Sequence, residues 1–322
     1  MKKIFLVTTL IWMVAVSAVS AANGASLVHK KGSLSYKHTQ YLSETIGPRV
    51  AASEEEAEAR EYIKGQFEKM GYETQVQDFS YARRGTSYDS ANVVAFKPGK
   101  SKKVLVVGAH YDSVARGKGS DDNASGVAVM LEAAEVLKKI PTPYSIVFVA
   151  FGAEEVELQG SNYFVSQMSA KDIENTVGMI NLDSLAVGDF MYVHGSLGED
   201  GFLRDHALAI ADKKKLDLRI NEGLNSDYPA GTTGDWSDHA PFKEVGIPYA
   251  YFESTNWEIG DQDGYTQTEE YGGIWHTEND TLEFIQQAYP GRLEERLKTY
   301  STVLIDLLKF TGKTSTEKNK VN

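Results

Sequence analysis

Apolar positions along the chain fall into short runs separated by segments with helical spacing. The run at residues 102–109 is continuously apolar after two lysines, which is typical of a strand buried on both faces. Further strands are expected at residues 145–151, 177–182, 190–194 and 247–252, and helices at 125–138, 160–168, 201–213 and 237–244. Strands that alternate with helices predict βαβ units and a largely parallel sheet.

The two ends of this pattern add further elements. Residues 54–70 place Ala57, Tyr62, Ile63, Phe67 and Met70 at roughly helical spacing and stop at Gly71, as a surface helix packed on a sheet would. Two strands are expected at 74–79 and 90–96, and a closing helix at 290–310. Without a repeat or a linker rich in Pro or Ser, the chain is expected to form one α/β domain at 37–312. Its mostly parallel mixed β-sheet is sandwiched between helices.

The first residues have the pattern of an export signal. Two lysines precede the apolar run 4–19, and small residues follow it at Ser20, Ala21 and Ala22. We expect a signal peptide at 1–21, a flexible lead-in at 22–36 and a disordered tail at 313–322. A membrane anchor is the alternative, but sixteen residues are short for a span. The mature protein is therefore expected to be secreted or periplasmic, without stable membrane association.

Charge and cysteine content restrict the partners and the site chemistry. The formal net charge is −12 and becomes −14 once Lys2 and Lys3 leave with the signal. Such an acidic surface does not favour nucleic acid as a partner. The chain has no cysteine, so folding uses no disulfide, and any metal site must use nitrogen and oxygen ligands.

Five motifs carry residues that can bind metal: His110, Asp122, Glu155, Asp183 and His276. Three of them directly follow expected strands, at the carboxyl edge where open α/β sheets place their sites. Imidazole and carboxylate suit zinc or a similar divalent ion. Each motif alone is weak, because a histidine at a strand end is more often structural and a Glu-Glu pair is usually solvated. Their joint placement predicts metal-assisted hydrolysis.

The simplest division gives each of two metals one histidine, one carboxylate and a share in a bridging carboxylate. Asp122, a short side chain in a tight loop, suits the bridge. In the adjacent pair Glu154 and Glu155, one residue can bind metal while the other acts as general base. Asp112 can accept the proton on the second ring nitrogen of His110 and so fix its tautomer.

On these motifs, residues 40–310 resemble the M28 family of zinc aminopeptidases, whose fold is the zinc-dependent exopeptidase type. The resemblance implies two Zn²⁺ per chain, one held by His110 and Asp183 and the other by Glu155 and His276. Asp122 would bridge them, Glu154 would be the general base, and Asp112 would support His110. It also implies a cis peptide bond after Asp122.

Later segments are similar to an exported branch of that family that removes N-terminal arginine. They include 203–211, 223–225 with 228–229, 253–257, 263–265 and 289–292. A basic substrate side chain would need a carboxylate partner, for which Glu253, Asp261 and Asp263 are candidates in the expected long loop 253–271. One feature departs from the family: a tyrosine that stabilises the transition state is replaced by Gly234. Tyr265 and Tyr271 in the long loop are the candidates to take its place.

These observations predict a secreted aminopeptidase that acts on the N-termini of peptides or proteins. Glutaminyl cyclase chemistry on the same fold, with one zinc, is the first alternative. A non-catalytic binding module on a peptidase fold is the second. The complete ligand set and the presence of Glu154 favour hydrolysis over both.

Overall fold

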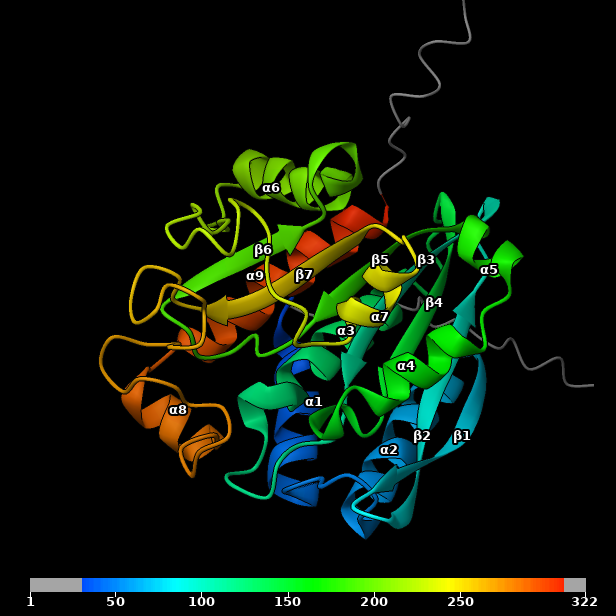
Figure 1. The fold of residues 1–322 in the computed structure, drawn as a ribbon, viewed down its shortest axis with the longest axis horizontal. Helices are drawn as coiled ribbons and strands as arrows, with labels where there is room; N and C mark the ends of the chain where they lie inside the picture. The colour runs from blue at the N-terminus through cyan, green and yellow to red at the C-terminus, as the bar shows by residue number, and fades with distance from the viewer. Residues whose placement is uncertain (1–30, 310–322) are drawn as a thin grey trace, which may run out of the picture.

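The computed structural model describes residues 31–309 as one α/β unit (Figure 1). The expected signal peptide and tail lie outside these residues, as does most of the expected lead-in. A single seven-stranded sheet has the order β1-β2-β4-β3-β5-β7-β6. Its four central strands, β4, β3, β5 and β7, run parallel, whereas β1, β2 and β6 are antiparallel to their neighbours. The expected fold class is confirmed.

The strands are β1 (Glu73–Arg83), β2 (Thr86–Lys97), β3 (Ser101–His110), β4 (Tyr144–Phe151), β5 (Thr176–Leu182), β6 (Phe190–Gly195) and β7 (Tyr249–Thr255). The helices are α1 (Ser33–Gln40), α2 (Glu54–Met70), α3 (Gly126–Leu137), α4 (Gln159–Ser166), α5 (Ala170–Asn175), α6 (Phe202–Lys214), α7 (His239–Glu244), α8 (Leu282–Ala288) and α9 (Arg292–Leu308). Every strand and helix expected from the sequence is present within a few residues of its predicted bounds.

Helices cover both faces of the sheet (Figure 1). On one face α3 packs against α1, α2 and α9, and their apolar side chains form the larger core with alternate residues of the strands. On the other face α4 and α7 cover a smaller core that includes Val106, Phe151 and Phe242. Leu105 and Val107 point into the larger core and Val106 into the smaller one, as the two-residue period of a doubly covered strand requires.

Three helices were not expected from the sequence: α1, α5 and α8. Residues 33–36 of α1 fall in the segment predicted as a flexible lead-in, so that boundary lies too late in the chain. The N-terminus of α1 is held by the buried side chain of Glu132 in α3, which accepts hydrogen bonds from the amides of Gly32 and Ser35 at 2.7 and 2.8 Å. This contact spans about a hundred residues and has no local signal.

The hairpin β1–β2 is longer than expected and is joined by a two-residue turn at Arg84 and Gly85, both with positive φ. Strand β7 also extends three residues further than predicted, to Thr255. Within residues 31–309, no helix is long and apolar enough to cross a membrane.

Candidate metal centre and substrate pocket

The five predicted metal ligands converge at the carboxyl edge of the parallel strands. His110 is the last residue of β3, Asp183 follows β5 directly, and Glu155 lies in the turn after β4. Asp122 comes from the turn before α3, and His276 comes from the loop between β7 and α8. This edge is where an open α/β sheet leaves a crevice for ligands.

The ligand atoms form two groups that share one residue. Nε2 of His110 lies 3.2 Å from a carboxylate oxygen of Asp122 and 3.2 Å from one of Asp183. Nε2 of His276 lies 3.2 Å from the other oxygen of Asp122 and 2.9 Å from Oε2 of Glu155. Within each group the donor atoms all lie within 4.8 Å of one another. Asp122 therefore presents one oxygen to each group, as a bridging ligand must.

The donor set fits a divalent cation. Ligands about 2.0–2.1 Å from a tetrahedral zinc lie roughly 3.3 Å apart, close to the separations found here. Oε1 of Glu155 is buried and has no hydrogen-bond partner among the described residues. Bound cations satisfy such orphaned carboxylate oxygens and offset buried negative charge.

The pKa values of the site residues reflect how closely the histidines and carboxylates approach one another. Burial alone would raise the pKa of Asp122, but hydrogen bonds to His110 and His276 outweigh it and hold this pKa below its usual range. The same carboxylate and Glu155 raise the pKa of His276 to about 11. Burial raises the pKa of Glu154 well above its ordinary value, while the His110 ring opposes this shift. His276 holds its proton strongly through these carboxylates, and a cation bound to the same atoms would compete with that proton.

Glu154 is placed beside the ligands without belonging to either group. Its Oε2 lies 3.9 Å from Nε2 of His110, and it lines the same pocket as the ligands. Asp112 lies beside the His110 ring, and its side chain also reaches the turn after β4. Nδ1 of His110 lies 3.3 Å from the backbone oxygen of Asp112 but 3.6 Å from its carboxylate. The carboxylate also accepts hydrogen bonds from the amides of Glu154 and Glu155, at 3.0 and 3.1 Å.

Two further contacts orient the ligands and were not predicted. Ser237 donates to Oδ2 of Asp183 at 2.7 Å and accepts a bond from Asn181 at 2.7 Å. The carboxylate of Asp280 accepts the amides of Asp121 and Asp122 at 2.6 and 3.2 Å. The peptide bond between Asp122 and Asn123 is cis, as expected. A Ser-Asp pair or a lone Asp in a loop gives no sequence signal for such roles.

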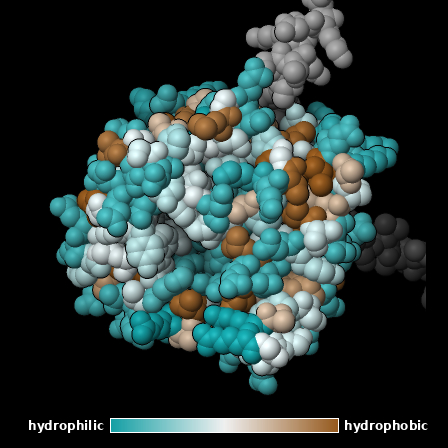
Figure 2. All heavy atoms as spheres, in the orientation of Figure 1, coloured by the Kyte–Doolittle hydropathy of each residue, from teal (hydrophilic) through white to brown (hydrophobic). Residues whose placement is uncertain are grey.

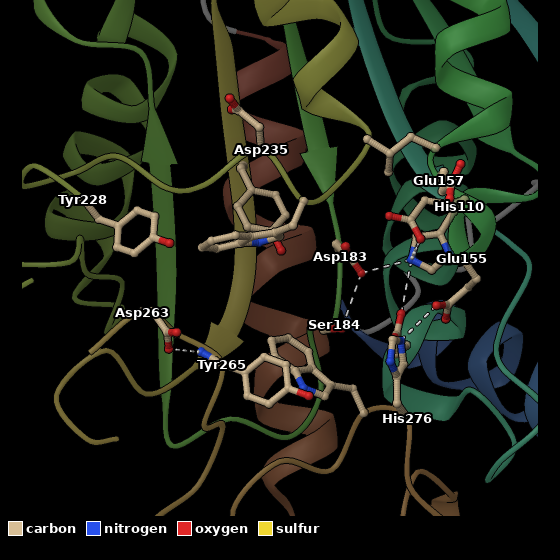
Figure 3. Close-up of a pocket in the computed structure, with 17 residues that line it drawn as sticks. His110, Glu155, Glu157, Asp183, Ser184, Tyr228, Asp235, Asp263, Tyr265 and His276 are labelled. Carbon is tan, nitrogen blue, oxygen red and sulfur yellow. Dashed lines mark hydrogen bonds and ion pairs between the residues drawn. The ribbon is translucent and has the colours of Figure 1, made fainter. Parts of the chain in front are cut away.

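A cavity of about 480 Å³ opens from the ligands toward a wall of aromatic and acidic side chains (Figure 3). The wall contains Tyr228, Asp235, Trp236, Tyr251, Asp263, Tyr265 and Trp275. Its rings pack on one another, with centroids 5.5 Å apart for Tyr228 and Trp236 and 5.8 Å apart for Tyr265 and Trp275. In Figure 2 the molecule is hollowed on this face, near the ends of β5 and β7.

Two of the five residues predicted to bind substrate line the cavity, and three do not. Asp263 and Tyr265 line the cavity, whereas Glu253, Asp261 and Tyr271 do not. Glu253 lies inside the extended β7, fully buried, and binds Nε2 of His194 at 2.8 Å and the Trp257 indole at 2.7 Å. Tyr271 packs edge-on against Phe284 and Tyr289. The side chains of Glu253 and Tyr271 are therefore engaged elsewhere, and Asp261 lies outside the cavity lining, which leaves Asp263 and Tyr265 as the candidates in the pocket.

Position 234, where the family pattern has a tyrosine, has no room for a side chain in this structure. A side chain at Gly234 would collide with the indole ring of Trp236, which itself lines the cavity. Tyr251, on β7, also lines the cavity, and its side chain is almost fully buried. The sequence singled out Tyr228 only as part of a motif of the exported branch, and it did not single out Trp236 or Tyr251. Their segments carry no metal ligand, and only the fold brings them to the ligands.

Comparison with known proteins agrees with this geometry. Residues 92–301 match the model of peptidase family M28. The chain is also 32% identical over 319 residues to the alkaline phosphatase isozyme conversion protein of Escherichia coli, covering 89% of this chain and 92% of that protein. The chain belongs to peptidase family M28.

Two solved structures share the fold. A zinc aminopeptidase from Bacillus subtilis superposes with a TM-score of 0.70 at 22% identity, covering 89% of this chain and 97% of that one. A glutaminyl cyclase from Porphyromonas gingivalis superposes with a TM-score of 0.66 at 21% identity, covering 86% and 97%. The fold is therefore shared by both chemistries, and the choice between them depends on the site.

Proposed function

We propose that this M28 protein is an exported aminopeptidase that holds two zinc ions and releases the first residue of peptides or proteins. The observation that carries the proposal is Asp122, whose two carboxylate oxygens each face a different histidine. A site for one ion would need only one of these groups. Both groups are complete, and Glu154 is present beside them.

In this proposal His110 and Asp183 hold one ion, His276 and Glu155 hold the other, and Asp122 belongs to both. The ions would supply Lewis acidity, polarising the scissile carbonyl and acidifying water. Glu154, buried at the wall of the cavity, accepts the proton of the attacking water and delivers it to the leaving amine. The amides of Glu154 and Glu155 both donate to the Asp112 carboxylate, and these bonds hold the base and the ligand in the orientation that faces the proposed ions.

The same site bears on the alternatives. A glutaminyl cyclase with one zinc would leave one of the two groups without a function, although both are assembled here. A non-catalytic module on this fold would be expected to lose a ligand or the base, and all six residues are in place. Hydrolysis at two metals is therefore the proposal that uses the whole site.

We further propose a preference for a basic first residue, with Asp263 as its partner. Asp235 is on the same wall but already pairs with Lys243 at 2.6 Å. Asp263 has no salt-bridge partner among residues 31–309, and one of its oxygens accepts the amide of Tyr265 at 2.9 Å. A guanidinium between Asp263 and the aromatic rings would gain a charged hydrogen bond and cation–π contacts.

Export rests on the pattern of residues 1–22 alone, and the proposed partners are the N-termini of peptides or proteins. The proposal is tested with a panel of arginyl, lysyl, leucyl and alanyl arylamides, together with a glutaminyl peptide as cyclase substrate. We expect release of the arylamine, fastest from arginyl substrates, and loss of activity with a chelator. Formation of pyroglutamate without release of a first residue would contradict the proposal and favour the cyclase.

A further inference from the structure

Glu154 and Glu155 lie in the turn that follows β4. The four successive backbone amides of residues 152–155 in this turn each donate a hydrogen bond to a buried side chain. Asn92 accepts from Gly152 at 3.2 Å, and Glu56 accepts from Ala153 at 3.0 Å. Asp112 accepts from the next two amides, as described above. Three side chains from separate elements therefore fix the path of this turn, because a buried amide left without an acceptor is costly.

Glu56 is the member of this set that belongs to a distant helix. It lies in the first turn of α2 and is only 3% exposed. Its Oε1 accepts from Ala153 and from the Ser90 hydroxyl at 2.7 Å, and its Oε2 accepts from Ala52 at 2.6 Å. Burial, together with the nearby Asp112 carboxylate, raises the pKa of Glu56 to about 7. A buried acid with a raised pKa is destabilising unless its hydrogen bonds compensate.

The backbone of the turn is shaped around this carboxylate. Ala153 has a φ of +54°, a left-handed conformation that is uncommon for a residue with a Cβ. A Cβ at Gly152 would collide with the Ser90 hydroxyl and lie 3.0 Å from Oε1 of Glu56. Glycine at 152 therefore leaves room for Glu56 and Ser90 to approach the turn, and the bond to Glu56 holds Ala153 in its conformation.

We propose that Glu56 is a positioning residue for Glu154 and Glu155, acting through the amide of Ala153. This inference rests on the proposed function for its effect on turnover, but the contact itself does not. Glu56 touches neither the ligands' side chains nor the cavity, so it cannot be a catalytic residue. Supports of this kind for ligands and bases are typically worth about 10- to 100-fold in activity or metal affinity.

The test compares Glu56→Ala and Glu56→Gln with two controls. Ser53→Ala removes the N-cap of the same helix, since the Ser53 hydroxyl accepts the amide of Glu56 at 3.1 Å. Glu132→Ala removes another buried carboxylate, the one that holds the N-terminus of α1. Both controls should lower the melting temperature without touching residues 152–155. The measurements are kcat, KM, zinc content, melting temperature and hydrogen exchange of the peptide that contains residues 152–155.

We expect Glu56→Ala to lower kcat about 10- to 100-fold with KM changed less than about threefold. Exchange at 152–155 should become faster. Glu56→Gln should retain more activity, because its amide oxygen can still accept from Ala153. In both controls kcat should stay near the wild-type value, and hydrogen exchange at 152–155 should remain as slow as in the wild type. Wild-type kcat in Glu56→Ala, or an equal loss in the controls, would overturn the proposal.

Hydrogen exchange separates this inference from the proposed function. If the wild-type protein released no residue from any substrate, the aminopeptidase proposal would fail. The exchange data would then still decide whether Glu56 fixes the turn. Faster exchange in Glu56→Ala than in Ser53→Ala would support the contact, and equal exchange would refute it.

Discussion

Ser237 donates a hydrogen bond to Asp183 across 2.7 Å, on the oxygen that does not face His110. The bond orients the carboxylate toward the first group of ligands. We predict that Ser237→Ala weakens zinc binding about 10- to 100-fold, because bonds behind a ligand tune its orientation and basicity. Competition with a chromogenic chelator measures the affinity. Ser254→Ala is the control and should bind zinc normally, because Ser254 is another buried serine, its hydroxyl donates to the backbone oxygens of 188 and 190, and it belongs to neither ligand group.

Glu154→Gln and Asp122→Ala should separate proton transfer from metal binding. The first removes a proton acceptor and keeps its shape, so zinc content should stay near wild type while kcat falls about 10²- to 10⁴-fold. The second removes the residue shared by both groups, so zinc should be lost together with activity. Metal analysis of both purified variants checks this. A Glu154→Gln enzyme with wild-type kcat would show that another group is the base.

Asp263→Asn should change specificity rather than chemistry. A charged hydrogen bond contributes about 1.5–3 kcal/mol, so the ratio of kcat/KM for arginyl over leucyl substrates should fall roughly 10-fold or more. Asp261→Asn is the matched control, since Asp261 lies in the same loop but outside the cavity. The assay is run at low and high salt to remove general attraction to an acidic protein. A preference for leucyl substrates in the wild type at both salt concentrations would refute a basic subsite.

Stability should fall as the pH drops from about 6.5 toward 4. His38 is buried and its Nδ1 lies 2.7 Å from the Tyr62 hydroxyl. Burial, with the charges of Lys37 and Lys69, lowers the pKa of His38 to about 4. The unfolded chain binds this proton first, so stability is complete above pH 6.5 and is lost toward pH 4, by at most about 3 kcal/mol. His239, whose pKa burial lowers to about 3, acts in the same direction.

His38→Gln keeps a polar group near Tyr62 but cannot titrate. Its urea midpoint should therefore vary less between pH 7 and pH 4.5 than that of the wild type. The remaining dependence should come from His239 and the acids of the metal site. An identical pH dependence in the variant would show that His38 is not buried in its neutral form.

The convergence of the proposed metal ligands could be predicted because of how several of them leave the sheet. His110, Asp183 and the Glu154–Glu155 pair each follow an apolar strand, and parallel strands bring their ends together. Asp122 and His276 lie in loops, and their places came from motif resemblance rather than from periodicity. The proposed ligand set could therefore be predicted by combining the strand pattern with the resemblance to the M28 motifs.

The substrate wall could not be predicted in the same way. Glu253 was assigned to a loop because the apolar run ends at Phe252, but pairing of Glu253 with Tyr192 continues the sheet and buries its side chain. Trp236 and Tyr228 belong to a segment without regular secondary structure, so no period reveals their direction. The sequence pattern did not predict helix α1 for a similar reason. This helix buries Ser35, His38 and Thr39 rather than an apolar stripe.

The central claim is that Asp122 joins two metal sites that act together. The most direct measurement is a zinc titration of the metal-free protein, following release of the first residue from an arginyl arylamide and bound zinc in the same samples. We predict that activity rises until two equivalents are bound and that Asp122→Ala shows no such rise. Full activity at one bound equivalent, unchanged on further addition, would contradict the account.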